Sequence, residues 1–295
     1  MLAGGCDAEY TEIVVERTDS NLQHRLPRAF DQRSTGQTRE GEAMFPFELL
    51  NLSHGFKRYF DIAPAVSDEL QDQAYGIRHR VYCEELGFEP VREDRRERDP
   101  YDTRAMHVLV RSMKADRFVA CARLVRVDPT DPTSLLPVEK ACAHTIDRSI
   151  LDPARLPRDR IAEISRLAIV PEFRRRTGEQ HTAIAVSEAD FGIVDMPRFP
   201  YIQVSLYLGA IALAKRLGVE TIFILTEPRL SSHLAKLGVR IQQIGGPVEH
   251  RGERVPSTMT VSSVEANLPR PVRPLWELIC DQIWTGFERR GATLH

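Results

Sequence analysis

The sequence lacks several features that mark large classes of protein. Its five cysteines are widely separated and form no Cys-x-x-Cys pair, so it predicts neither a disulfide framework nor a cysteine zinc site. No window approaches the roughly 18 uninterrupted apolar residues of a membrane-spanning helix. The acidic N-terminal residues do not resemble a signal peptide. We therefore expect a cytoplasmic protein without a transmembrane segment.

An excess of charge of one sign is also missing. The 40 basic and 42 acidic residues give a formal net charge of -2, which provides no whole-chain attraction for nucleic acid or an anionic membrane. The nine histidines form no His-x-x-x-His pair or His/Cys cluster, so no metal site is expected. What remains is an ordinary globular composition, 42% hydrophobic and 28% charged.

The chain is predicted to divide into a tail, one large domain and a helical extension. Residues 1–43 have no sustained apolar period and should be a disordered tail. Residues 45–265 should form one domain, with an insertion at 128–160 that contains three Asp-Pro pairs. Residues 266–295 should add a C-terminal helix that covers an open face.

Hydrophobic periodicity predicts the fold class of the domain. Ser67 can cap a helix whose apolar stripe ends near Gly87. Strand-like runs at 106–111 and 118–127 suggest a hairpin, and the later strands are separated by helices. This order predicts an α/β fold with a mixed central sheet flanked by helices, and not an all-parallel Rossmann sheet.

Two predicted strands carry charge on mostly apolar faces. Arg123 is the lone charge on its face of strand 118–127, so it needs a carboxylate from the fold or from a ligand. On strand 161–170, alternation puts Glu163 and Ser165 on one face and Arg166 on the other. Desolvation of Glu163 would raise its pKa, which suits a general base, although a buried pair with an arginine is the structural alternative.

Other polar residues allow both functional and structural interpretations. On the predicted helix, Tyr75, Arg78 and Tyr82 lie along the edge of the apolar stripe, where they can frame a ligand anion or close the core. Asp99 and Asp102 are either loop carboxylates in salt bridges or a paired acceptor for an ammonium group.

A basic turn follows the Glu163 strand. Its members are Arg174, Arg175, Arg176, Thr177 and Gly178. The turn is either solvated or a phosphate site, because arginines and backbone amides after a strand can hold a pyrophosphate or phosphopantetheine.

Together these residues resemble a known signature. In order and nearly in spacing, they are similar to the signature of the acyl-homoserine-lactone (autoinducer) synthases, over Arg78, Tyr82, Phe88, Asp99, Asp102, Arg123, Glu163, Ser165 and Arg166. The chain also resembles the N-acyl amino acid synthases and, in residues 163–169, 172–178 and 227–252, the acyltransferases associated with PEP-CTERM/exosortase systems. The resemblance implies a GNAT-like acyl-CoA N-acyltransferase fold and acyl transfer.

Departures from the signature bear on both substrates. Tyr82 and Phe88 stand where the synthases have Phe and Trp, which help shape the S-adenosylmethionine site, so the resemblance favours a free amino acid as acceptor. The phosphate-binding pattern at 175–180 lacks its final small residue, which favours an acyl carrier protein over coenzyme A as donor. Arg174 to Arg176 would then contact the acidic carrier, with Gly178 at the phosphopantetheine.

The resemblance implies an N-acyltransferase that moves a long-chain acyl group from an acyl carrier protein thioester to the amine of an amino acid-like acceptor. Glu163 would act as base, and Ser165 would orient the nucleophile or protonate the thiolate. Arg123 would hold Asp99 or Asp102, and Arg78 would bind the acceptor carboxylate. The insertion and the C-terminal helix are expected to form walls of an acyl pocket.

Two alternatives are a homoserine-lactone synthase that uses S-adenosylmethionine and a non-catalytic acyl-binding module. No permanently bound cofactor is expected, only the acyl-phosphopantetheine donor.

Overall fold

The computed structural model describes residues 52–128, 130–131, 133–174, 200–227, 234–235, 237–250 and 252–293. The predicted disordered tail lies outside the described residues, as do Arg175, Arg176 and Gly178 of the basic turn.

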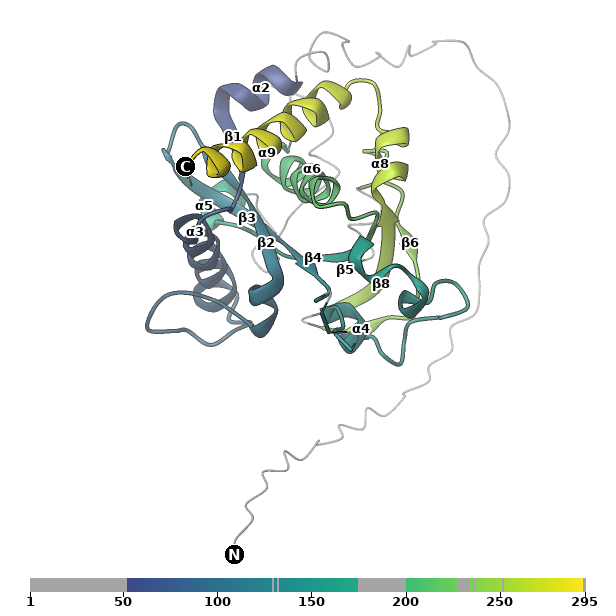
Figure 1. The fold of residues 1–295 in the computed structure, drawn as a ribbon. Helices are drawn as coiled ribbons and strands as arrows, with labels where there is room; N and C mark the ends of the chain where they lie inside the picture. The colour runs from purple at the N-terminus through teal and green to yellow at the C-terminus, as the bar shows by residue number, and fades with distance from the viewer. Residues whose placement is uncertain are drawn as a thin grey trace, which may run out of the picture. The chain divides into compact units, whose positions relative to one another are not determined.

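The core of the fold is a mixed eight-stranded sheet (Figure 1). The strands lie in the order β1 (Phe60–Pro64), β2 (Ala105–Ser112), β3 (Arg117–Arg126), β4 (Ile161–Ile169), β5 (Thr221–Thr226), β8 (Glu253–Thr260) and β6 (Gln242–Gln243), and β7 (Val248–Glu249) pairs with β8. The β4 and β5 pair is parallel and the other pairs are antiparallel. The mixed sheet that the sequence predicts is therefore confirmed.

Helices flank the sheet, and short helical turns occur in the segments between the elements (Figure 1). The α-helices are α2 (Leu52–Tyr59), α3 (Asp68–Arg78), α4 (Pro137–Ala141), α5 (Pro171–Arg174), α6 (Tyr201–Arg216), α8 (Val261–Asn267) and α9 (Arg273–Thr293). A π-helical turn, η1 (His79–Glu85), continues α3, and the 3-10 turns are η2 (Pro100–Arg104), η3 (Pro153–Arg155) and η4 (Arg158–Arg160).

The two layers of helices lie on opposite faces of the sheet. A Cβ at Gly209 of α6 would lie 2.3 Å from Ile62 Cδ1 and 3.1 Å from Val108 Cγ2, so this helix approaches the sheet closely. On the other face, the Cys121 thiol lies 3.8 Å from the Ala74 carbonyl oxygen of α3. Because Val108 is next to Leu109, which pairs with Cys121, the two contacts are on opposite faces.

Local signals in the sequence explain how the first helix begins and ends. The Ser67 hydroxyl accepts a hydrogen bond from the Leu70 amide, as an N-cap does. Gly87 has φ of 63°, the left-handed conformation that follows many helix ends. The predicted helix and its cap are thus confirmed, with a π-helical turn in its last part.

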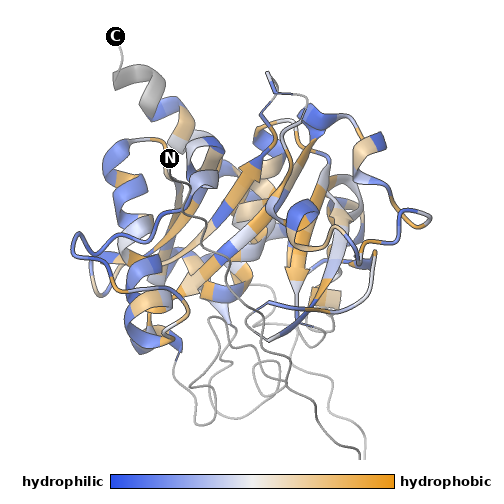
Figure 2. Cartoon of the chain, turned by 90° about the horizontal axis from the view of Figure 1, so that it is seen from below, coloured by the Kyte–Doolittle hydropathy of each residue, from blue (hydrophilic) through white to orange (hydrophobic). Residues whose placement is uncertain are grey.

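The hydrophobic residues are concentrated between the layers (Figure 2). Helix α6 is buried over most of its length because its residues are apolar on every side. The predicted C-terminal helix is present as α9, which packs against α6, α2 and β1. Over the residues that the structure describes, no helix has the length and hydropathy needed to cross a bilayer.

Candidate active site

A cavity of about 380 Å³ opens where β4 and β5 separate. The two strands are paired only from Ile161 to Ile164 on β4, although β4 continues to Ile169. Residues from both faces of the sheet line the cavity, including α4 on one face and α6 on the other. Its polar end contains Asp99, Arg123, Glu163, Ser165 and Arg166.

Glu163 is the buried carboxylate of this cavity. It lies on β4, its side chain is only 4% exposed, and its Oε2 accepts a hydrogen bond of 2.6 Å from the Val138 amide in the first turn of α4. Burial raises the pKa of Glu163 to about 7, although the Val138 amide and the charges of Arg123 and Arg166 act in the opposite direction. A carboxylate with this pKa can accept a proton near neutral pH.

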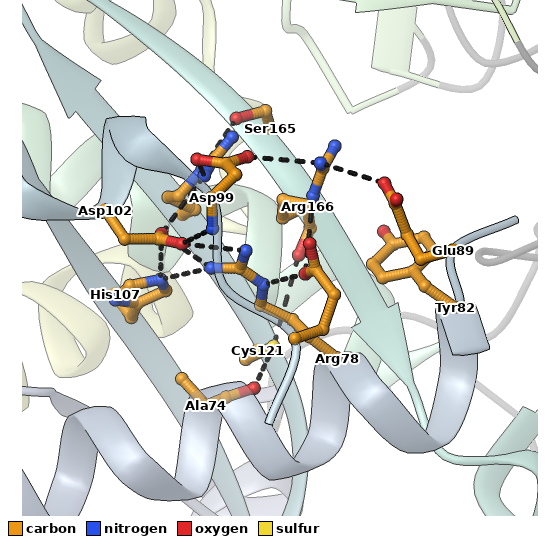
Figure 3. A network of polar contacts seen from close by, with 12 residues as sticks. Ala74, Arg78, Tyr82, Glu89, Asp99, Asp102, His107, Cys121, Ser165 and Arg166 are labelled. Carbon is orange, nitrogen blue, oxygen red and sulfur yellow. Dashed lines mark hydrogen bonds and ion pairs between the residues drawn. The ribbon is translucent and has the colours of Figure 1, made fainter. Parts of the chain in front are cut away.

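Three arginines and their carboxylates form a largely buried network (Figure 3). Arg78 Nε donates to Glu97 at 2.5 Å, and its two Nη atoms contact the two Asp102 oxygens at 2.6 and 2.9 Å. Arg123 Nη1 donates to Asp99 at 2.7 Å and to Asp102 at 3.0 Å. The carboxylate partner predicted for Arg123 therefore comes from the fold.

The network keeps Asp102 ionised. Burial disfavours its charge, but hydrogen bonds from His107 and Arg78 and the charge of Arg123 hold the pKa of Asp102 well below its ordinary value. Burial lowers the pKa of His107, whose Nε2 lies 3.1 Å from Arg78 Nη1. An ionised Asp102 can thus bridge two arginines.

Arg166 lies in the cavity, and the prediction that it points away from Glu163 and Ser165 is wrong. Its φ is 52°, and two residues of β4 between Ser165 and Ala168 face one residue of β3, which is a β-bulge. The bulge interrupts strict alternation. As a result Arg166 Nη2 lies 3.1 Å from Asp99 Oδ2 and 3.3 Å from Glu89 Oε1 (Figure 3).

Tyr82, Phe88 and Ser165 also line the cavity, as does Asp99. The Tyr82 hydroxyl donates to the Leu167 carbonyl at 2.7 Å, and Arg123 Nε donates to Ser165 Oγ at 3.2 Å. The structure therefore brings together six of the residues that the sequence singles out around Glu163.

Three of the predicted residues have other surroundings. Arg78 is fully buried and, like Asp102, is not among the residues that line the cavity, so the predicted contact of Arg78 with an acceptor carboxylate does not fit this geometry. Arg174 is 6% exposed and forms an ion pair with Glu85, so burial keeps its guanidinium from the surface that a carrier protein would meet.

Sequence reasoning missed several residues of the site. Tyr101 and Lys140 line the polar end, and Tyr207 of α6 lines the cavity on the opposite face. Glu97, which accepts a hydrogen bond from Arg78 within the network, is buried at 1% exposure. The charged run from 92 to 104 gave no signal that distinguished Glu97 from its exposed neighbours, and the positions of Lys140 and Tyr207 depend on contacts between distant segments.

The walls of the cavity agree in part with those predicted. The insertion contributes Pro137, Val138, Lys140 and Ala141, whereas α9 supplies none of the described lining residues because it packs behind α6. On the α6 side of the sheet the lining of the cavity is apolar, with side chains from α6, β5 and β8 such as Ile211, Ile224 and Met259. Within the described part of the chain, no group of three or more His, Cys, Asp or Glu residues is placed to hold a metal ion.

Comparison with known proteins places part of the chain in a described domain. The profile of the acetyltransferase (GNAT) domain matches residues 77–183. No curated protein matches the sequence.

Several solved structures resemble the chain. TofI, in a ternary complex with an inhibitor and MTA, is 19% identical, with 70% of this chain and 96% of TofI covered and a TM-score of 0.47. BjaI, a CoA-dependent acyl-homoserine lactone synthase with SAM and isopentyl-CoA, is 19% identical, with 70% and 87% covered and a TM-score of 0.47. FeeM, an N-acyl amino acid synthase from uncultured soil microbes, is 12% identical, with 71% and 94% covered and a TM-score of 0.45. The chain thus combines a mixed α/β fold with a match to the acetyltransferase (GNAT) domain across residues 77–183.

Proposed function

We propose that the protein is an N-acyltransferase that moves an acyl group from the phosphopantetheine thioester of an acyl carrier protein to the amine of an amino acid-like acceptor. The observation that carries this proposal is the place of Glu163. It is a buried carboxylate with a pKa near 7, in a cavity that is polar on one face of the sheet and apolar on the other.

In the proposed reaction the acceptor amine attacks the thioester carbonyl carbon directly. The C–N bond forms, the C–S bond breaks, and Glu163 accepts the proton that the nitrogen loses. The departing thiolate takes up a proton to give the thiol. The Ser165 hydroxyl on β4 can pass this proton on and regain one from protonated Glu163, which returns both groups to their starting state. No covalent enzyme intermediate is needed, because the cavity holds both reactants together.

The polar network fixes the geometry around the base. Arg123 joins Asp99 at the cavity to the buried Asp102, and Arg78 holds Asp102 from behind. Asp99 thus presents a carboxylate whose position is set by Arg123 and Arg166. In this arrangement Arg78 is a positioning residue, and the Asp99 carboxylate, held by Arg123 and Arg166, is part of the wall that the acceptor would meet.

The apolar part of the cavity suits the acyl chain. Side chains of Ile211, Ile224, Leu234 and Met259 surround it, and burial of each methylene there contributes about 0.8 kcal/mol. The thioester would then lie at the opening between β4 and β5, next to Glu163. Docking of a carrier protein and the association with a PEP-CTERM/exosortase system stay predictions.

A second candidate is acyl-homoserine-lactone synthesis from S-adenosylmethionine. The observation that favours it is the grouping of two aromatic rings, Tyr82 and Phe88, with the Asp99 carboxylate in one wall. Such a group can bind a sulfonium cation through cation–π and ionic contacts.

The test is product identification by mass spectrometry. The protein is incubated with acyl carrier protein thioesters or acyl-CoA of several lengths and with each amino acid or S-adenosylmethionine. We expect an N-acyl amino acid that the wild type forms and Glu163→Gln does not. An acyl-homoserine lactone would establish the second candidate, and carrier binding without any adduct would establish a non-catalytic acyl-binding module.

A further inference from the structure

The cations of the cavity differ in their partners. Arg123 is paired with Asp99, Arg166 with Asp99 and Glu89, and Arg254 of β8 with Glu227 at 2.9 Å. Each guanidinium therefore already faces a carboxylate of the fold, so none of them offers an uncompensated positive charge to a ligand.

Lys140 is the exception among the lysines and arginines that line the cavity. Over the described residues it forms no ion pair, and its Nζ lies 5.5 Å from the centre of the Tyr101 ring. Contact with the ring leaves the ammonium without a counterion, because an aromatic face attracts a cation without neutralising it. The neighbouring carboxylate, Glu139, is held by Arg158 at 2.8 Å.

The position of Lys140 relates it to the proposed base. It belongs to α4, whose Val138 amide donates to Glu163 at 2.6 Å, so the lysine is two residues from the group that holds the base. Tyr101 follows Asp99 by two residues and its amide donates to the Asp99 carboxylate at 2.9 Å. Lys140 and Tyr101 are thus lining residues of the same cavity as the base and Asp99, and the side chain of Lys140 is exposed at its rim.

We propose that Lys140 is the residue that binds the carboxylate of the amino acid-like acceptor. This inference rests on the proposed function and adds to it the group that recognises the acid. The acceptor amine lies between Glu163 and Asp99, and its carboxylate forms a charge-assisted contact with the lysine. Lys140 takes the place that the sequence assigned to Arg78, whose guanidinium is buried behind the network.

The experiment compares amino acids with their primary amides, which keep the amine and lose the negative charge. Steady-state rates are measured with a decanoyl carrier protein thioester for wild type, Lys140→Met and Lys140→Arg. The matched control is Lys114→Met, on the exposed β2–β3 turn away from the cavity. Binding of the same acids and amides is measured by calorimetry without the donor.

We expect Lys140→Met to raise KM for the free amino acid about 10- to 100-fold, from loss of roughly one charged hydrogen bond, with little change in kcat. KM for the amide should stay within about twofold, Lys140→Arg should retain most of the preference for the acid, and Lys114→Met should match wild type.

The outcomes separate the two proposals. The inference alone is overturned if the protein turns over acid and amide equally, or if Lys140→Met changes KM for the two substrates equally. Binding of acids over amides that depends on Lys140, with no turnover, supports the inference on the acid group and overturns the acyl-transfer proposal. If neither acids nor amides bind or react, both are overturned.

Discussion

Replacement of Glu163 by glutamine tests whether one buried carboxyl group controls both activity and stability. The side chain is nearly isosteric, and its amide oxygen can still accept the hydrogen bond from the Val138 amide. The change therefore removes the titration of residue 163 and little else. Two measurements follow from it, with opposite signs.

The first measurement is the free energy of unfolding. Folding raises the pKa of Glu163 from 4.5 to about 7, which at 1.36 kcal/mol per pKa unit is about 3 kcal/mol. The folded state binds the proton more tightly, so ionisation of Glu163 lowers the free energy of unfolding. This loss is absent below the unfolded pKa, grows between about pH 4.5 and 7, and is complete above pH 7. Glutamine does not ionise, so Glu163→Gln lacks this loss of stability. The variant should be more stable than wild type by about 3 kcal/mol at pH 8 and by under about 1 kcal/mol at pH 5.

The second measurement is the pH dependence of kcat/KM. In wild type it should rise as the pH increases through about 7, because only the ionised Glu163 accepts a proton. In Glu163→Gln it should fall by about 10² to 10⁴, the usual contribution of a general base, and lose that rise.

Urea denaturation at the two pH values and an initial-rate assay give both results, with the exposed Glu93→Gln as a control expected to lie within about 0.5 kcal/mol of wild type. An equal stability difference at pH 5 and pH 8 would refute the burial argument, and full activity of Glu163→Gln would remove the residue from the role of base.

Two further substitutions test the buried polar groups around the cavity. Tyr207→Phe should raise the free energy of unfolding by about 1 kcal/mol in a thermal or urea melt, because the buried hydroxyl has no hydrogen-bond partner among the described residues. Tyr82→Phe, which loses a real hydrogen bond, should lower it, and a loss of stability in both variants would contradict this reasoning. Arg78→Met should lower the free energy of unfolding by about 3 to 5 kcal/mol, since it leaves two carboxylates buried without their cation, whereas the exposed Arg98→Met should change it by less than about 1 kcal/mol. If Arg78→Met lowers the free energy of unfolding only slightly in urea denaturation, the carboxylates must rearrange when the arginine is removed.

Features that depend on neighbouring residues could be predicted from the sequence. The Ser67 cap, the left-handed Gly87 and the hairpin of β2 and β3 each follow from residues within one turn or one strand. The shared face of Glu163 and Ser165 also follows from alternation along a single strand.

Features that depend on pairing between distant segments could not be predicted. Arg166 enters the cavity because β4 bulges against β3, and a single strand carries no sign of such a register shift. Arg78 is buried because Glu97 and Asp102 fold over it from a loop whose path local patterns do not determine. Lys140 reaches the polar end because the insertion folds back onto Glu163, which the Asp-Pro pairs within it do not indicate.

Because β4 separates from β5, the cavity has a charged part and an apolar part that are lined by different residues. The charged groups belong to one face of the sheet, and the apolar lining of α6 belongs to the other. In the proposed reaction, a change at Ile211 would alter which chain fits while the proton transfer at Glu163 stays as it is. Variation of Lys140 would alter the acceptor and leave the chain pocket unchanged. If the proposed reaction holds, donor and acceptor preference are two traits of this scaffold that can change separately.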